Sequence, residues 1–180
     1  EIRMRLVGSE MRIRDRLRRD PENLGRRLFA SHCSSCHRYN GHDGRGYPVD
    51  DPQSAADLAG FASAEWITEL LNYDHYVSAK YFGGTKFKDG TMAKKVLAKY
   101  SEEERALLPK IAKLLADQAA LPYESALNEE KKEELLGLFY NDDLKFEDGR
   151  ACIECHDIDS EEEGYDPDLT GYGSREWLIA

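Results

Sequence analysis

The sequence predicts an all-α chain that contains two copies of one helical domain, the second incomplete at its carboxyl end. Several segments place apolar residues at helical spacing, no stretch alternates convincingly like a strand, and two distant stretches of the chain repeat each other. The 180 residues are long enough for two small compact units.

Four segments carry the helical signals. Residues 22–33 align Leu24, Leu28 and Phe29 on one face, and Ser63 is placed to cap a helix that carries Trp66. Residues 101–104 read Ser-Glu-Glu-Glu, a capping box that opens a third helix, which Pro109 is expected to kink or restart. Residues 128–140 form the fourth segment.

The internal repeat is read from matching letters. Residues 57–67 and 168–178 share Asp-Leu-x-Gly-aromatic-x-Ser-x-Glu-Trp-aliphatic. The two tryptophans, Trp66 and Trp177, lie 111 residues apart. The first copy continues for about fifty residues of helical pattern after its tryptophan, whereas the second reaches Ala180. We therefore expect an arginine-rich arm over 1–20, a first domain over 21–120 and a truncated second domain over 121–180.

All four cysteines belong to two Cys-x-x-Cys-His motifs, Cys33 to His37 and Cys152 to His156. This pattern is typical of c-type haem attachment. Two thiols at this spacing each add to one haem vinyl group, and the following histidine is then held as an iron ligand. The motifs predict two haem c groups, bound covalently by Cys33, Cys36, Cys152 and Cys155 and ligated by His37 and His156.

Three other uses of these cysteines fit the sequence less well. A four-thiolate zinc site would join pairs separated by far more chain than usual and would leave both histidines unexplained. A thioredoxin-like dithiol expects one Cys-x-x-Cys in a strand-helix context, and a disulfide within this spacing is strained. None of these uses explains two complete motifs.

The charge pattern limits the partners. The formal net charge of -10 argues against nucleic-acid binding and favours a basic or neutral partner, with the acidic run over 157–163 able to steer it. The first twenty residues hold seven arginines, which fits either a solvated arm or a docking segment. No apolar run approaches a membrane span, so membrane contact is expected only through a segment outside this sequence or through a partner subunit.

The stretch from Gly25 to His37 resembles the opening of class I cytochromes c. In that family the second axial ligand is a methionine ahead of the final helix, and the resemblance therefore implies that Met92 is the sixth ligand of the first haem. His32, His42 and His75 are alternative ligands but are better read as surface or haem-edge residues. The fold implied is a tandem of class I cytochrome c domains.

Both repeats, together with residues 81–92, look like the dihaem cytochrome c regions associated with bacterial cytochrome bc-type quinol-oxidising complexes. This resemblance implies an electron-transfer protein or subunit rather than an enzyme. It would be periplasmic or otherwise extracytoplasmic, and would carry single electrons from such a complex to another cytochrome or an oxidase in a respiratory chain. The rival hypothesis is a dihaem peroxidase with one open haem site.

Overall fold

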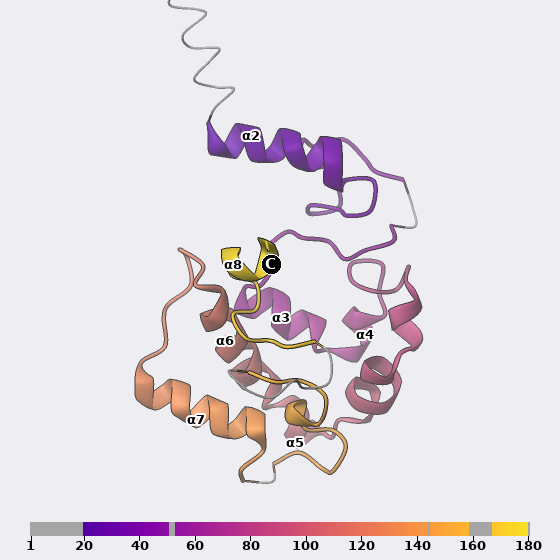
Figure 1. The fold of residues 1–180 in the computed structure, drawn as a ribbon. Coiled ribbons are helices and arrows are strands. Elements are labelled where there is room, and N and C mark those ends of the chain that lie inside the picture. Colours follow the sequence, from indigo (N-terminus) through magenta and orange to yellow (C-terminus); the bar gives the residue numbers. More distant parts are fainter. Residues whose placement is uncertain (1–19, 51–52, 144, 159–166, 180) are drawn as a thin grey trace, which may run out of the picture. The chain divides into compact units, whose positions relative to one another are not determined.

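The computed structural model describes residues 20–50, 53–143, 145–158 and 167–179 (Figure 1). The chain divides into two compact units, Glu1–Ala59 and Gly60–Ala180. The described residues form helices and no β-strand, apart from isolated bridges such as that between Tyr39 and His42. The predicted all-α class is confirmed for this part of the chain, and the predicted arginine-rich arm lies outside it, except for Asp20.

The first unit delivers its cysteine motif from a helix. Helix α2, Pro21–Leu28, begins at Asp20, whose carboxylate accepts from the backbone N–H groups of Glu22 and Asn23 at 3.0 and 3.2 Å. It continues as the π-helix η1, Phe29–Cys33, which ends on the first cysteine of the motif. The helix predicted over 22–33 is therefore present.

The loop after the first motif folds back onto this helix. Gly44 has a φ of +82°, and a Cβ atom at that position would lie 3.0 Å from Cδ1 of Phe29. The Phe29 ring also contacts Tyr39 edge-on, with centroids 5.8 Å apart. Only glycine allows this close return of the chain.

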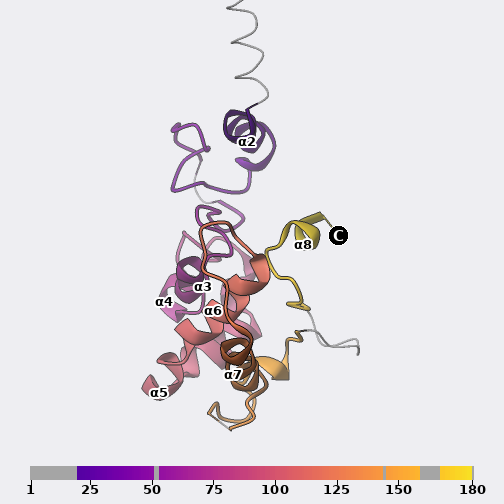
Figure 2. The ribbon, with the colours of Figure 1, turned by 90° about the vertical axis from the view of Figure 1, so that its left-hand side faces the viewer.

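The second unit begins with helix α3, Ala64–Leu70, capped by Ser63, whose hydroxyl accepts from Trp66 N–H at 3.1 Å. Short elements follow: α4 (Tyr73–Tyr76), the 3₁₀-helix η2 (Lys86–Asp89), the π-helix η3 (Met92–Val96) and the 3₁₀-helix η4 (Leu97–Lys99). Helix α3 packs on α6, Leu108–Ala119 (Figure 2). The apolar face of α6 supplies much of the buried core.

The capping box and the effect of Pro109 are both as predicted. Ser101 accepts from Glu104 N–H, and the Glu104 carboxylate accepts from Ser101 N–H at 2.7 Å, which starts α5, Glu102–Arg105. Pro109 lies in the first turn of the separate helix α6, where its missing N–H costs no intrahelical hydrogen bond. The proline restarts the helix.

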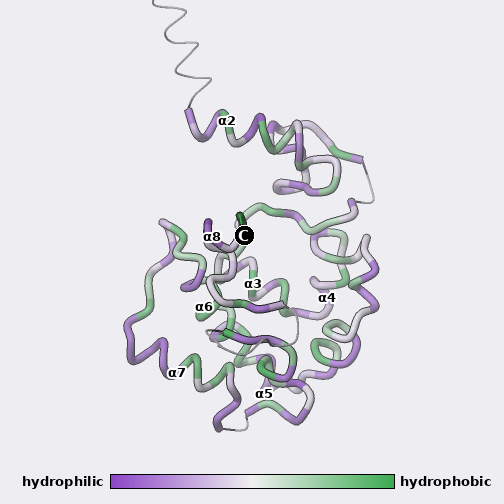
Figure 3. The backbone as a smooth tube through the Cα atoms, viewed as in Figure 1, coloured by the Kyte–Doolittle hydropathy of each residue, from purple (hydrophilic) through white to green (hydrophobic). Residues whose placement is uncertain are grey.

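The second cysteine motif follows α7, Glu129–Tyr140, the helix predicted over 128–140, and Asn128 caps it by accepting from Lys131 N–H at 2.8 Å. Its hydropathy changes from hydrophilic at the start to hydrophobic towards the end (Figure 3). The 3₁₀-helix η5, Cys152–Glu154, and helix α8, Arg175–Ile179, complete the described elements. Trp66 on α3 is 4% exposed, whereas its repeat counterpart Trp177 on α8 is 36% exposed. The domain boundaries and the incomplete second domain stay predictions.

Candidate functional site

Both cysteine motifs fold into the same tight turn. The N–H groups of Cys36 and His37 donate to the carbonyl oxygen of Cys33 at 3.0 and 2.9 Å. In the second motif, the N–H groups of Cys155 and His156 donate to the carbonyl oxygen of Cys152 at 3.2 and 2.9 Å. All four thiols are free. Each turn therefore gathers two thiols and one imidazole within five residues.

Each histidine is held through one ring nitrogen by a backbone carbonyl. Nδ1 of His37 lies 2.7 Å from the oxygen of Ala56, and Nδ1 of His156 lies 3.0 Å from the oxygen of Pro167. A carbonyl oxygen only accepts, so Nδ1 carries the proton in both rings. This tautomer leaves the lone pair of Nε2 to bind a metal, and the hydrogen bond orients the ring.

The two histidine-holding carbonyls occupy equivalent positions of the repeat. Each belongs to the residue immediately before Asp-Leu-x-Gly. A second contact is also repeated: Leu58 N–H donates to Arg38 O, and Leu169 N–H donates to Asp157 O, both at 2.8 Å. The histidine and the carbonyl are 19 residues apart in the first copy and 11 in the second. The loop between the histidine and the carbonyl is thus eight residues shorter in the second copy, and the histidine still makes the same hydrogen bond.

The aspartate after each carbonyl differs between the copies. Asp57 is buried and accepts from three backbone N–H groups, those of Asn40 at 2.8 Å, Gly41 at 2.7 Å and Ala59 at 2.9 Å. Asp168 is exposed and accepts from the hydroxyl and N–H of Thr170, which lower the pKa of its carboxyl. Asp57 therefore binds the loop that follows the first motif, whereas the hydrogen bonds of the Asp168 carboxylate given above are local.

Local surroundings shift the pKa values of the Cys152 and Cys36 thiols in opposite directions. Desolvation raises the pKa of the Cys152 thiol to about 12, with the nearby Cys155 contributing in the same direction. Hydrogen bonds from Ser54 and Ser35 lower the pKa of Cys36. Cys152 consequently remains a neutral thiol at pH 7.

A buried ion pair fixes the chain just before the second motif. Glu104 is 3% exposed and accepts from Arg150 Nε at 3.0 Å and from Glu147 N–H at 3.1 Å. The Tyr100 hydroxyl donates to the carbonyl oxygen of Arg150 at 3.0 Å. Arg150 stands two residues before Cys152, so the network positions the start of the motif. Sequence reasoning missed it, although an acidic capping-box residue and an arginine beside the motif were visible.

These residues fit a covalently bound haem. The thiols are free and correctly spaced, and Nε2 of each histidine is available. Large apolar side chains of the first unit, including Leu24 and Leu28, are exposed, as expected where a large apolar group completes a small core. Among the described residues, no cluster of three or more His, Cys, Asp or Glu side chains could hold a metal ion by itself.

Met92 is the half-buried first residue of η3, in the second unit, whereas His37 belongs to the first. Its role as the sixth ligand stays a prediction. His32 and His75 are exposed, and Nδ1 of His42 accepts from Gly44 N–H at 2.9 Å.

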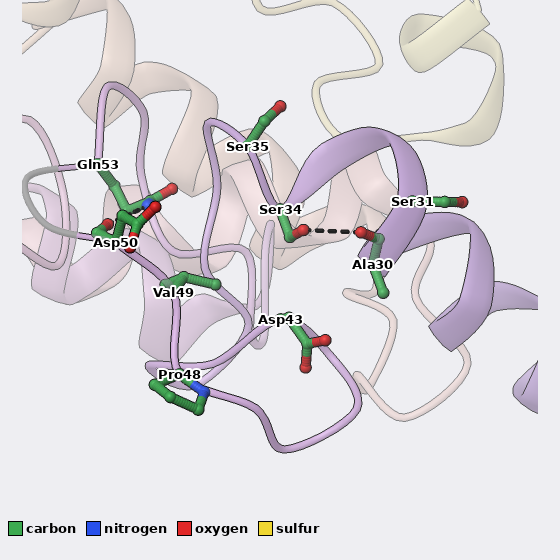
Figure 4. Close-up of a pocket in the computed structure, with 9 residues that line it drawn as sticks. All are labelled: Ala30, Ser31, Ser34, Ser35, Asp43, Pro48, Val49, Asp50 and Gln53. Carbon is green, nitrogen blue, oxygen red and sulfur yellow. Dashed lines mark hydrogen bonds between the residues drawn. The ribbon is translucent and has the colours of Figure 1, made fainter.

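A polar pocket lies beside the first motif (Figure 4). Its volume is about 370 Å³, and the Ser34 hydroxyl at its wall donates to the carbonyl oxygen of Ala30 at 2.8 Å. The wall consists of Ala30, Ser31, Ser34, Ser35, Asp43, Pro48, Val49, Asp50 and Gln53. Neither the cysteines nor His37 line it, and its polarity does not suit a porphyrin.

Comparison with known proteins agrees with this geometry. Residues 23–110 match the family model described as Cytochrome c. No curated protein and no solved structure matches the chain. In the described part, we find no helix both long and apolar enough to cross a membrane. The match includes the first motif, its histidine-holding carbonyl and Met92. Residues 23–110 therefore match a cytochrome c domain, and such a domain implies haem-based electron transfer.

Proposed function

We propose that the chain is a dihaem c-type cytochrome that transfers single electrons between a quinol-oxidising membrane complex and a downstream cytochrome or oxidase. The repeated hydrogen bond from histidine Nδ1 to the carbonyl before Asp-Leu-x-Gly carries this proposal. The family match covers the first motif only. The same tautomer and the same turn at the second motif support a second attachment site.

Seven side chains would hold the two haem groups covalently or through the iron. Cys33 and Cys36 would form the thioethers of the first group, and His37 and Met92 would supply ligands to its iron. Cys152, Cys155 and His156 would hold the second. When bound, each haem supplies an iron that gains or loses one electron. The residues orient the ring, exclude water and set the potential through burial and charge.

Reductive titration tests whether both sites work. The chain, matured with haem, should accept two electrons, and the double variant Cys152→Ala/Cys155→Ala should accept one because it retains only the first pair of thioethers. The matched double variant Cys33→Ala/Cys36→Ala should also accept one, at a different potential. If the unaltered chain accepts a single electron, the second motif is not a haem site.

The ferric spectrum distinguishes this function from a peroxidase. A low-spin spectrum with a methionine-sulfur band that Met92→Ala abolishes, together with no peroxide turnover, supports the carrier and the proposed ligand. A high-spin haem that turns over peroxide would instead favour an enzyme with an open iron site.

The proposed partners differ in charge. Residues 80–99 hold six lysines and one acidic residue, Asp89, around the predicted ligand Met92, whereas the chain as a whole carries -10. Lys88 and Lys95 are exposed. We therefore propose an acidic partner at this segment and a basic partner elsewhere, in an extracytoplasmic compartment.

Ionic strength should reveal this basic segment. Electron transfer to an acidic partner should slow as salt rises from about 0.01 to 0.15 M, because the Debye length contracts from about 30 to 8 Å. Lys88→Glu/Lys95→Glu should flatten this dependence, and Lys110→Glu, an exposed lysine on α6, should not. If the rate depends on salt equally in the unaltered chain, the double variant and Lys110→Glu, the acidic partner does not bind at residues 80–99.

A further inference from the structure

The two repeats contact each other through equivalent residues. Phe61 and Tyr172 hold the same position of the repeat, and their ring centroids lie 5.8 Å apart with an interplanar angle of 51°. The next residues, Ala62 and Gly173, also meet: a Cβ atom on Gly173 would lie 2.3 Å from that of Ala62. Contact between like positions is the pattern of a self-complementary, isologous interface. All four residues belong to the second compact unit.

The backbones at this contact also match. Ala62 and Gly173 both have positive φ, 63° and 75°, and so do the preceding repeat glycines, Gly60 at 73° and Gly171 at 66°. Each turn closes with a 2.9 Å hydrogen bond, from Ser63 N–H to Gly60 O and from Ser174 N–H to Gly171 O. The two turns therefore present the same shape to each other, and the missing side chain of Gly173 allows the close approach.

The contact joins two pairs of aromatic rings, one from each repeat. Trp66 lies 5.1 Å from Phe61, Phe61 lies 5.8 Å from Tyr172, and Tyr172 lies 5.0 Å from Trp177. The outer two pairs are edge-to-face, at 68° and 63°. Burial raises the pKa of the Tyr172 phenol to about 12, so the ring at the centre stays neutral at pH 7.

Each central ring is close along the chain to a histidine-holding carbonyl. Phe61 follows Ala56 by five residues, and Tyr172 follows Pro167 by five. These carbonyls accept from His37 and His156. A path of covalent bonds and one hydrogen bond thus leads from His37 to the Phe61 ring, and an equivalent path leads from His156 to the Tyr172 ring. The contact between Phe61 and Tyr172 connects the two paths.

We propose that Phe61 and Tyr172 form the contact through which an electron passes between the two haem attachment sites of the chain. This inference rests on the proposed dihaem function. One site loses one electron and the other gains it. No bond changes, no proton moves and no further oxidant or reductant is needed. The pairing makes the chain a two-site carrier whose sites equilibrate internally before a partner is engaged.

The test uses the matured dihaem chain and the variants Phe61→Leu and Tyr172→Leu, with Tyr172→Phe as the control that keeps the ring. Pulse radiolysis that delivers less than one electron per chain populates both sites, and their later redistribution reports internal exchange, since its rate does not depend on protein concentration. We expect both leucine variants to slow this phase severalfold and the phenylalanine variant to preserve it. Unchanged exchange in both leucine variants overturns the inference.

A second readout does not involve electron transfer. Gly173→Ala should lower the melting temperature by several degrees more than Gly171→Ala, because both glycines have positive φ but only Gly173 lies against Ala62. A Phe61→Leu/Tyr172→Leu double-mutant cycle should also show coupling between the two rings. Equal melting temperatures and additive effects would contradict the contact.

Failure of this inference is distinguishable from failure of the dihaem function. Haem content and reductive titration are measured on the same samples. Two electrons accepted, with exchange unaffected by the ring variants, overturns the contact alone. One electron accepted overturns the dihaem function as well.

Discussion

Glu104→Ala is expected to lower the free energy of unfolding by about 3 kcal/mol, since removal of a buried hydrogen-bonded charge strands its partners. Glu104 accepts from two backbone N–H groups and from Arg150 Nε, and Arg150 has a side chain only 17% exposed. Without the carboxylate, Arg150 Nε and the N–H groups of Ser101 and Glu147 lose their acceptor, and the Arg150 guanidinium keeps its ion pair with the exposed Glu147 carboxylate at 2.8 Å. Chemical denaturation of the chain measures the loss.

The reciprocal variant Arg150→Ala adds a pH signature. Desolvation alone would raise the pKa of Glu104, but hydrogen bonds from Ser101, Glu147 and Arg150 outweigh it and lower the pKa below its usual value. Because the pKa of Glu104 is lower in the folded chain than in the unfolded chain, ionised Glu104 stabilises the fold. This stabilisation is fully present above the unfolded-state pKa of about 4.3 and is lost as the pH falls through the pKa of the folded chain. Without Arg150, the pKa of Glu104 is lowered less, so the variant loses less stability than the unaltered chain as the pH falls. The difference in unfolding free energy between the two proteins should therefore become smaller in acid.

The control for this pair is Glu134→Ala, which removes an exposed carboxylate 2.5 Å from Lys131. Exposed pairs of this kind contribute little because solvent screens them. If Glu104→Ala and Glu134→Ala destabilise the chain equally, the buried network does not hold the segment before Cys152.

Asp57→Ala should cost about 3 kcal/mol of unfolding free energy, because three backbone N–H groups in part-buried hydrogen bonds lose one shared acceptor. The carbonyl that holds His37 belongs to the neighbouring residue, Ala56. We therefore expect the ferric signal of the first haem to broaden, in addition to the loss of stability. Asp57→Asn keeps one oxygen and should be intermediate.

The second repeat supplies the matched control. The Asp168 carboxylate is exposed and accepts from the hydroxyl and the N–H of Thr170, so Asp168→Ala should cost about 0.5 kcal/mol. The unfolding free energies of the two alanine variants, measured under the same conditions, decide the matter. A cost at Asp168 as large as that at Asp57 would show that burial does not distinguish the two aspartates.

Local signals in the sequence predicted much of the fold. Each of these signals depends on residues close together along the chain: Asp-Leu-x-Gly, the cap at Ser63, the capping box at Ser101 and the restart at Pro109. For that reason the helix starts at Ser63 and Ser101 and the effect of Pro109 could be predicted from the sequence alone.

Contacts between distant residues could not be read in this way. The Glu104–Arg150 pair joins residues 46 positions apart, and the Phe61–Tyr172 contact joins positions 111 apart. The carbonyl opposite each histidine ring was also missed, because a backbone oxygen has no letter of its own. Its equivalent position in both copies becomes visible only once the eight-residue loop difference is aligned.

The mass of the matured chain under denaturing conditions tests the central claim most directly. Thioethers survive denaturation, so the account predicts the mass of the bare polypeptide plus two haem groups, falling to one in either double cysteine variant. A mass that matches the bare chain, or the chain with a single haem, would contradict it.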